Sequence, residues 1–85
     1  MGIHKSHPAI IKRLKRAQGH LRSIVRMLED TCSCLDAAQQ LQAVEKAVCN
    51  AKKTLIHDHI DHCLSHDDKG GANQLSELKK ITKYL

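Results

Sequence analysis

Large aromatic side chains are almost absent from this chain of 85 residues, which has no Trp, no Phe and a single Tyr, Tyr84. A core must therefore be built from Leu, Ile, Val and Ala, which bury less area per residue than aromatic side chains do. A chain this short is marginally stable alone and usually needs a metal ion, disulfides or partner chains. The composition therefore favours one small domain that is completed by association.

Long apolar runs are missing too. No stretch approaches the roughly 18 consecutive apolar residues of a membrane span, and no secretory leader pattern is visible. The four cysteines lack the loop-rich surroundings of a disulfide scaffold. We therefore expect a cytoplasmic protein with reduced thiols and no membrane partner. Metal binding or redox sensing is then the chemistry open to the cysteines.

Helix breakers are scarce, since the only proline is Pro8 and no glycine lies between Gly19 and Gly70. Apolar residues instead alternate at spacings of three and four, which is the heptad pattern of helix bundles. In the first half they are Ile10, Leu14, Ala17, Leu21, Ile24 and Leu28, and in the second Leu41, Val44, Val48, Ala51 and Leu55. The pattern predicts an all-α fold of one domain. Its parts are a flexible arm over 2–7 and helices over 8–29, 35–64 and 73–85.

Acidic residues are absent from the first predicted helix until Glu29. Its polar face is instead basic over some five turns, and the formal net charge of the chain is +5. Such a face is either an ordinary solvated surface or a contact for nucleic-acid phosphates, and the single charge sign favours the phosphates. No helix-turn-helix spacing or aromatic stacking platform is evident, so we expect double-stranded DNA to be bound through shape and backbone. The candidate DNA-binding residues are Lys12, Arg13, Lys15, Arg16, Arg22 and Arg26.

Histidine and cysteine gather in the stretch 57–66, which holds four of the seven histidines and one cysteine. On a helix His59 and Cys63 are neighbours one turn apart, with side chains roughly 5–6 Å from each other. An imidazole and a thiolate at that spacing can bind one soft or borderline metal ion. The alternative is a polar helix end whose histidines are simply solvated. An enzyme is not expected, because no nucleophile and base pair or cofactor loop lies outside this cluster.

A third candidate ligand, Cys34, begins the second predicted helix, 25 residues before His59. At 1.5 Å per residue the two would lie about 37 Å apart in a straight helix, too far for one metal site. Two antiparallel copies of the helix would bring Cys34 of one chain beside His59 and Cys63 of the other. The hypothesis gives two equivalent sites in a symmetric homodimer. Metal binding across the two chains could then change the spacing of the basic helices.

Further nitrogen ligands are available at the N-terminus, where His4 and His7 precede the first helix. They are either tail residues or additional ligands to the metal. Cys32 could replace Cys34, and His62 or His66 could supply nitrogen, so these alternatives stay open.

The chain resembles the CsoR/RcnR family of bacterial metal-sensing repressors over nearly its whole length. The resemblance is carried by Lys12-Arg13-Leu14-Lys15-Arg16, Gly19-His20-Leu21-Arg22, Met27-Leu28-Glu29, Cys34-Leu35-Asp36, Gln40-Leu41-Gln42-Ala43-Val44 and Asp58-His59-Ile60-Asp61-His62-Cys63. It implies three helices per protomer, an antiparallel dimer forming a four-helix bundle, and a dimer of dimers. It also implies binding of operator DNA without metal and release of the DNA when metal binds.

The resemblance further implies roles for single residues. Cys34, His59 and Cys63 match the family's metal ligands, and His7 or His4 would correspond to the N-terminal ligand of its nickel and cobalt sensors. Glu77 matches an acidic residue that contacts the ligand histidine, and Arg13 a DNA-contacting position. Ser33 departs from the Tyr often found there in copper sensors, and Cys32 is additional.

The expected function is a repressor that responds to Ni(II) or Co(II), because the histidine-bearing arm would raise the number of ligands above three. A Cu(I)-responsive repressor is the alternative within the family, since Cys34, His59 and Cys63 alone form a soft trigonal site. A metal buffer or chaperone without DNA binding is the alternative of another class.

Overall fold

A computed structural model describes residues 6–65 and 71–85, and at 63–65 and 71–74 it describes the backbone only. Three α-helices follow one another: α1 (His7–Glu29), α2 (Cys34–Ser65) and α3 (Gly71–Ile81). A single 3-10 turn, η1 (Thr82–Tyr84), ends the chain. The described residues form no strand, and the prediction of an all-α fold with three helices is confirmed.

The helix ends differ from the predicted ones for local reasons. α2 begins at Cys34 and not at residue 35, because the Ser33 hydroxyl accepts a hydrogen bond of 3.0 Å from the Asp36 N–H and so caps the helix. α2 ends at Ser65, one residue beyond the predicted 64, and α3, predicted over 73–85, runs from Gly71 to Ile81. There the Thr82 hydroxyl donates a bond of 2.7 Å to the Lys79 carbonyl, a local bond that competes with regular helix. Of the predicted arm 2–7, Ser6 is the N-cap residue of α1, His7 is its first residue, and 2–5 lie outside the described residues.

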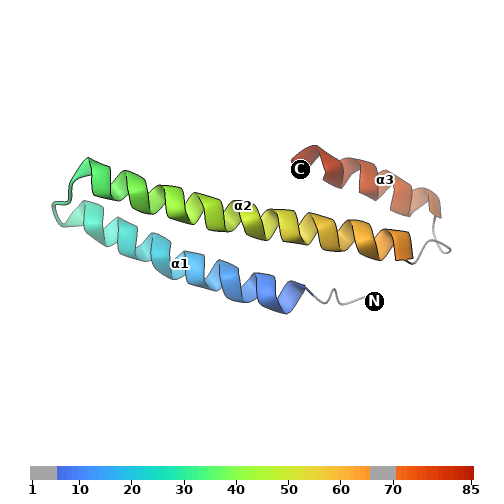
Figure 1. Cartoon of the computed structure of the whole chain (residues 1–85), viewed down its shortest axis with the longest axis horizontal. Helices are drawn as coiled ribbons and strands as arrows, with labels where there is room; N and C mark the ends of the chain where they lie inside the picture. The colour runs from blue at the N-terminus through green and yellow to red at the C-terminus, as the bar shows by residue number, and fades with distance from the viewer. Residues whose placement is uncertain (1–5, 66–70) are drawn as a thin grey trace.

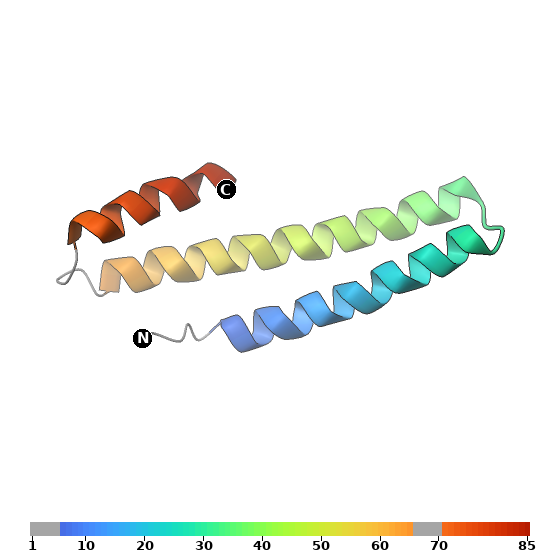
Figure 2. The ribbon, with the colours of Figure 1, turned by 180° about the vertical axis from the view of Figure 1, so that it is seen from behind.

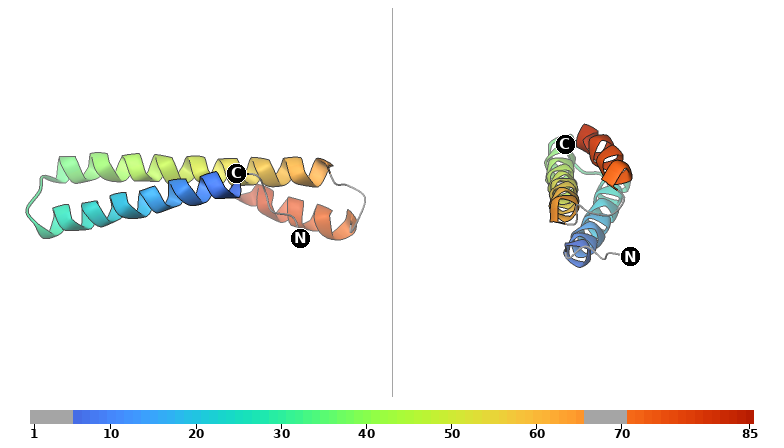
Figure 3. Two further views of the ribbon diagram at one scale, coloured as in Figure 1. Left: turned by 90° about the horizontal axis from the view of Figure 1, so that it is seen from below. Right: turned by 90° about the vertical axis from the view of Figure 1, so that its right-hand side faces the viewer.

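α1 and α2 form an antiparallel hairpin along the long axis of a molecule of 56 × 23 × 14 Å (Figure 1). α3 doubles back along the C-terminal part of α2, as the reverse view also shows (Figure 2). The start of α1 therefore lies near the C-terminal part of α2, at the end of the hairpin away from the α1–α2 connection. Seen end-on, α1 and α3 contact α2 along different sides (Figure 3).

The hairpin core uses only half of the predicted heptad seam. Six of the seven buried apolar residues in the described part of the chain recur every seven positions, as Ile10, Ala17 and Ile24 on α1 and Ala37, Val44 and Ala51 on α2, and the seventh is Ile56. The remaining seam residues also recur every seven positions but are between 37% and 61% exposed. They are Leu14, Leu21 and Leu28 on α1 and Leu41, Val48 and Leu55 on α2. We call these six residues the open seam.

None of the helices in the described part of the chain is long and apolar enough to cross a membrane.

Candidate metal centre and nucleic-acid interface

His59 lies near the C-terminal end of α2, and its side chain is only 16% exposed. Its Nε2 atom is 3.5 Å from Oε1 of Glu77, which α3 carries back alongside α2. A carboxylate facing one ring nitrogen fixes the orientation of the imidazole, as it commonly does for histidines that bind metal ions. Cys63 follows one turn later in α2, and its side chain lies outside the part that the structure describes.

Cys34 is the first residue of α2, and its side chain is exposed. His59 follows 25 positions later in the same continuous helix, so the two lie about 37 Å apart at 1.5 Å per residue. Within the described residues of one protomer, no three His, Cys, Asp or Glu side chains come together in a way that could hold a metal ion. Cys32, Cys34 and Cys49 are free thiols.

The candidate ligands on α2 lie at the ends of its half of the open seam. Cys34 precedes Leu41 by seven residues, and His59 follows Leu55 by four. Spacings of seven and four keep residues on one side of a helix. Any chain that covered the open seam would therefore also come close to Cys34 at one end and to His59 at the other.

The N-terminal end of α1 is tied to the same turn of α2. The Ser6 hydroxyl donates a partly buried hydrogen bond of 2.6 Å to Oδ2 of Asp58, the residue before His59. His7, the next residue, is half-buried and precedes Leu14 by seven positions, so it continues the α1 half of the open seam. His4, the other candidate N-terminal ligand, lies outside the described residues.

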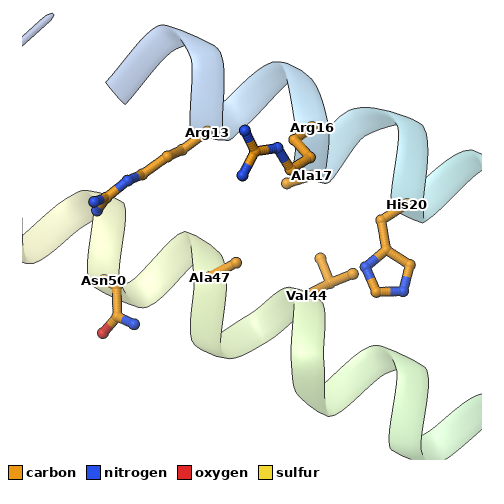
Figure 4. A pocket seen from close by; sticks show the side chains of 7 residues that line it. All are labelled: Arg13, Arg16, Ala17, His20, Val44, Ala47 and Asn50. Carbon is orange, nitrogen blue, oxygen red and sulfur yellow. The ribbon is translucent and has the colours of Figure 1, made fainter. Parts of the chain in front are cut away.

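The candidate DNA-binding residues divide into two groups. All six are exposed on α1, but only Arg13 and Arg16 line a groove between α1 and α2 with a cavity of about 330 Å³. The groove's floor is small and aliphatic, and Arg13 extends across it towards the turn of α2 that carries Asn50 (Figure 4). At one end His20 Nε2 and Gln40 Oε1 form a hydrogen bond of 2.6 Å that joins the two helices. The other four residues are Lys12, Lys15, Arg22 and Arg26.

The sequence interpretation missed several of these residues. Ser33 and Asp36 have the Ser-x-x-acid spacing of a capping box, so their contact was open to detection. Asp58 and Asn50 carried no such signal. Their partners in the groove and at the start of α1 lie far away in the sequence and become neighbours only because the hairpin folds at 30–33.

Comparison with known proteins decides the family. A family model described as metal-sensitive transcriptional repressor matches residues 6–84. The chain belongs to this family. The resemblance to CsoR and RcnR repressors is thereby confirmed, and the protein is a metal-sensing transcriptional repressor and not an enzyme.

Two relatives illustrate the match. The copper-sensing transcriptional repressor CsoR of Mycobacterium ulcerans (strain Agy99) is 38% identical over 82 residues, which cover 91% of this chain and 70% of that protein. The protein of the same name from Bacillus subtilis (strain 168) is 38% identical over 85 residues, covering 93% of this chain and 84% of that protein.

A solved structure supports the fold. The nickel-responsive transcriptional regulator InrS superimposes with a TM-score of 0.81 over 100% of this chain and 99% of that one. Its sequence identity is 24%, so the likeness concerns the arrangement of helices alone.

Proposed function

We propose that this repressor binds operator DNA in its metal-free form and releases it on binding Ni(II) or Co(II). Each metal site would be made by two antiparallel protomers, with Cys34 from one chain and His59, Cys63 and His7 from the other. The observation that carries the choice of metal is the position of His7, which lies beside the His59 turn and on the open seam.

The residues available fit such a metal. Thiolate sulfur and imidazole nitrogen are the ligands that late first-row metal ions prefer. The imidazole of His59 is oriented by Glu77, as ligating histidines generally are by a carboxylate. When bound, the ion would supply the cross-link between protomers. The chain's own residues would hold the ion and transmit the resulting change in protomer arrangement to α1.

His7 distinguishes the metals. A second imidazole raises the number of protein ligands from three to four, and Ni(II) and Co(II) suit four or more ligands. Cu(I) is satisfied by the three soft ligands alone. The Ser6–Asp58 hydrogen bond holds residue 7 near this end of α2 and therefore supports the assignment to Ni(II) or Co(II).

A Cu(I)-responsive repressor is the second candidate. It is favoured by the names of the relatives above, which describe copper-sensing repressors at 38% identity. The two candidates share Cys34, His59 and Cys63 and differ in the need for His7.

The DNA surface would combine the exposed basic residues of α1 with the groove between α1 and α2. Arginine and lysine side chains at phosphates release counterions, so binding should weaken steeply with salt. Arg13 and Arg16 belong to α1 and also line the groove. A change in the angle between protomers would therefore move the groove and the other basic residues of α1 together.

A titration of Ni(II), Co(II) and Cu(I) into the metal-free protein on labelled operator-like duplex DNA tests the proposal. We expect all three ions to bind, and Ni(II) or Co(II) to release the DNA. His7→Ala should weaken Ni(II) binding by at least tenfold and leave Cu(I) binding in place. His57→Ala, an exposed histidine on the same helix, is the matched control. No release by any ion would contradict metal sensing, and a lack of DNA binding would favour a metal buffer.

A further inference from the structure

Ser6 stands at the N-cap position of α1 but does not cap it. Serine at this position normally accepts a hydrogen bond from a backbone N–H of the first turn, which stabilises the helix. Here the side chain makes no cap bond and its hydroxyl donates across 52 residues of sequence to Oδ2 of Asp58, at 2.6 Å. The serine has therefore exchanged a local bond for one that joins α1 to α2.

This hydrogen bond joins the two residues that directly precede the candidate imidazole ligands. Ser6 directly precedes His7, and Asp58 directly precedes His59. Both side chains of the bond are partly buried, so water competes with it less than at an open surface. Figure 1 shows the start of α1 beside the C-terminal part of α2, where the bond is made.

We propose that Ser6 and Asp58 are positioning residues that set the preference for Ni(II) or Co(II) over Cu(I), by holding His7 beside the His59 turn. The inference rests on the proposed function, because it concerns the ligand that separates these metals. Neither residue needs to touch the metal. Their role is to fix the first turn of α1 before the metal arrives.

The physical reason is preorganisation. The first turn of a helix has unpaired N–H groups and frays, so a ligand carried there must be ordered when the metal binds. The Ser6–Asp58 hydrogen bond is already present in the metal-free protein. It therefore removes the free-energy cost of ordering His7 when the metal binds. Hydrogen bonds to charged groups correspond to about a ten- to hundredfold change in an equilibrium constant, which is the size of the expected effect. Cu(I), bound by Cys34, His59 and Cys63, gains nothing from His7.

The test compares Ni(II) and Cu(I) affinities of the full-length protein by chelator competition, for Ser6→Ala, Asp58→Ala and His7→Ala. Ser6→Ala is the cleaner variant, because Asp58 makes other interactions as well. Asp61→Ala is the matched control, since Asp61 is an exposed carboxylate one turn further along α2. Thermal unfolding, monitored by circular dichroism, shows independently of metal affinity whether a variant destabilises the helical fold.

We expect Ser6→Ala and Asp58→Ala to lower Ni(II) affinity about ten- to a hundredfold and to change Cu(I) affinity less than threefold. Asp61→Ala should change neither. In a His7→Ala background, Ser6→Ala should have no further effect on Ni(II), because the two act through the same ligand.

Equal losses of Ni(II) and Cu(I) affinity in Ser6→Ala would show a merely structural bond and overturn the inference. So would an unchanged Ni(II) affinity in a protein whose Ni(II) binding does depend on His7. These outcomes leave the proposed function intact. If Ni(II) binding by the unaltered protein is indifferent to His7→Ala, the nickel and cobalt assignment fails together with the inference.

Discussion

The turn of α2 that carries Asp58 and His59 is contacted by both other helices. Glu77 of α3 faces the Nε2 atom of His59, and the preceding Asp58 accepts a hydrogen bond from the start of α1. A single turn of α2 is therefore connected to both other helices. A metal ion bound by His59 would act on a turn that already contacts α1 and α3. This turn is therefore suited to transmit metal binding to both helices.

The side chain of Glu77 is 67% exposed, so its contact with His59 adds little to the stability of the metal-free fold. Its value should appear in the metal-bound form, where it orients the imidazole. We expect Glu77→Ala to lower metal affinity about 10–100-fold, the usual effect of losing the partner of a ligating histidine. Glu77→Gln, which keeps an acceptor, should lose less. Chelator competition measures both, and an unchanged affinity in Glu77→Ala would contradict the orienting role.

Residue types and spacing suggested His59 and Cys63 as candidate ligands, because an imidazole and a thiol one helical turn apart carry a chemical signal of their own. Cys34 was preferred to Cys32 through the family resemblance, and all three assignments stay predictions. The pairing of His59 with Glu77 came only from the family resemblance, and the structure brings these two side chains together. Ser6 and Asp58 could not be selected. Serine and aspartate are common surface residues, and their contact depends on the register of the hairpin.

At the scale of the helix, heptad spacing predicted the existence and length of the helices but not the partner of each apolar position. On each of α1 and α2, two interleaved sets of apolar residues repeat every seven positions. Either set could form the contact between helices. The structure assigns the set with Ile24 and Val44 to the hairpin core and leaves the set with Leu21 and Val48 open. Periodicity alone could not make this assignment, because both sets are apolar and equally regular in spacing.

The open seam should bind a second copy of the chain. Val48 lies at its centre on α2 and is 41% exposed in the single chain. We expect Val48→Glu to yield monomers, since burying an uncompensated carboxylate in an apolar contact is costly. Gln39→Glu adds the same charge at an exposed position of α2 and should leave the dimer intact. Sedimentation equilibrium distinguishes the two, and a dimeric Val48→Glu would show that the open seam is not the contact.

The groove between α1 and α2 should contribute more to DNA binding than its number of basic residues suggests. Arg13 and Arg16 line it together with Asn50, so α2 also contributes to the surface. Substituting Arg13 by Ala should weaken DNA binding about tenfold, because a charge-assisted phosphate contact is lost. The slope of log affinity against log salt should fall by about one per contact removed. Lys83→Ala, in η1, is the control, and equal effects of the two variants in fluorescence anisotropy would indicate non-specific charge attraction.

At the scale of the whole molecule, the separation of Cys34 from His59 makes a site shared between chains directly testable. A protomer with Cys34→Ala keeps His59 and Cys63, whereas a protomer with Cys63→Ala keeps Cys34. In an antiparallel heterodimer of these two variants, one site would have all its ligands and the other would lack both cysteines. Neither variant alone would have a complete site, so restoration in the mixture requires ligands from two chains.

We therefore expect each variant alone to bind metal at least a hundredfold more weakly than the unaltered protein, since each lost thiolate removes a ligand from every site. The heterodimer, co-expressed with two different tags and purified on both, should bind one metal ion per dimer with nearly the original affinity. A heterodimer of Cys34→Ala with the double variant Cys34→Ala/Cys63→Ala is the control and should bind none tightly. If the first heterodimer also binds none, or if either variant alone retains tight binding, the ligands do not come from two antiparallel chains.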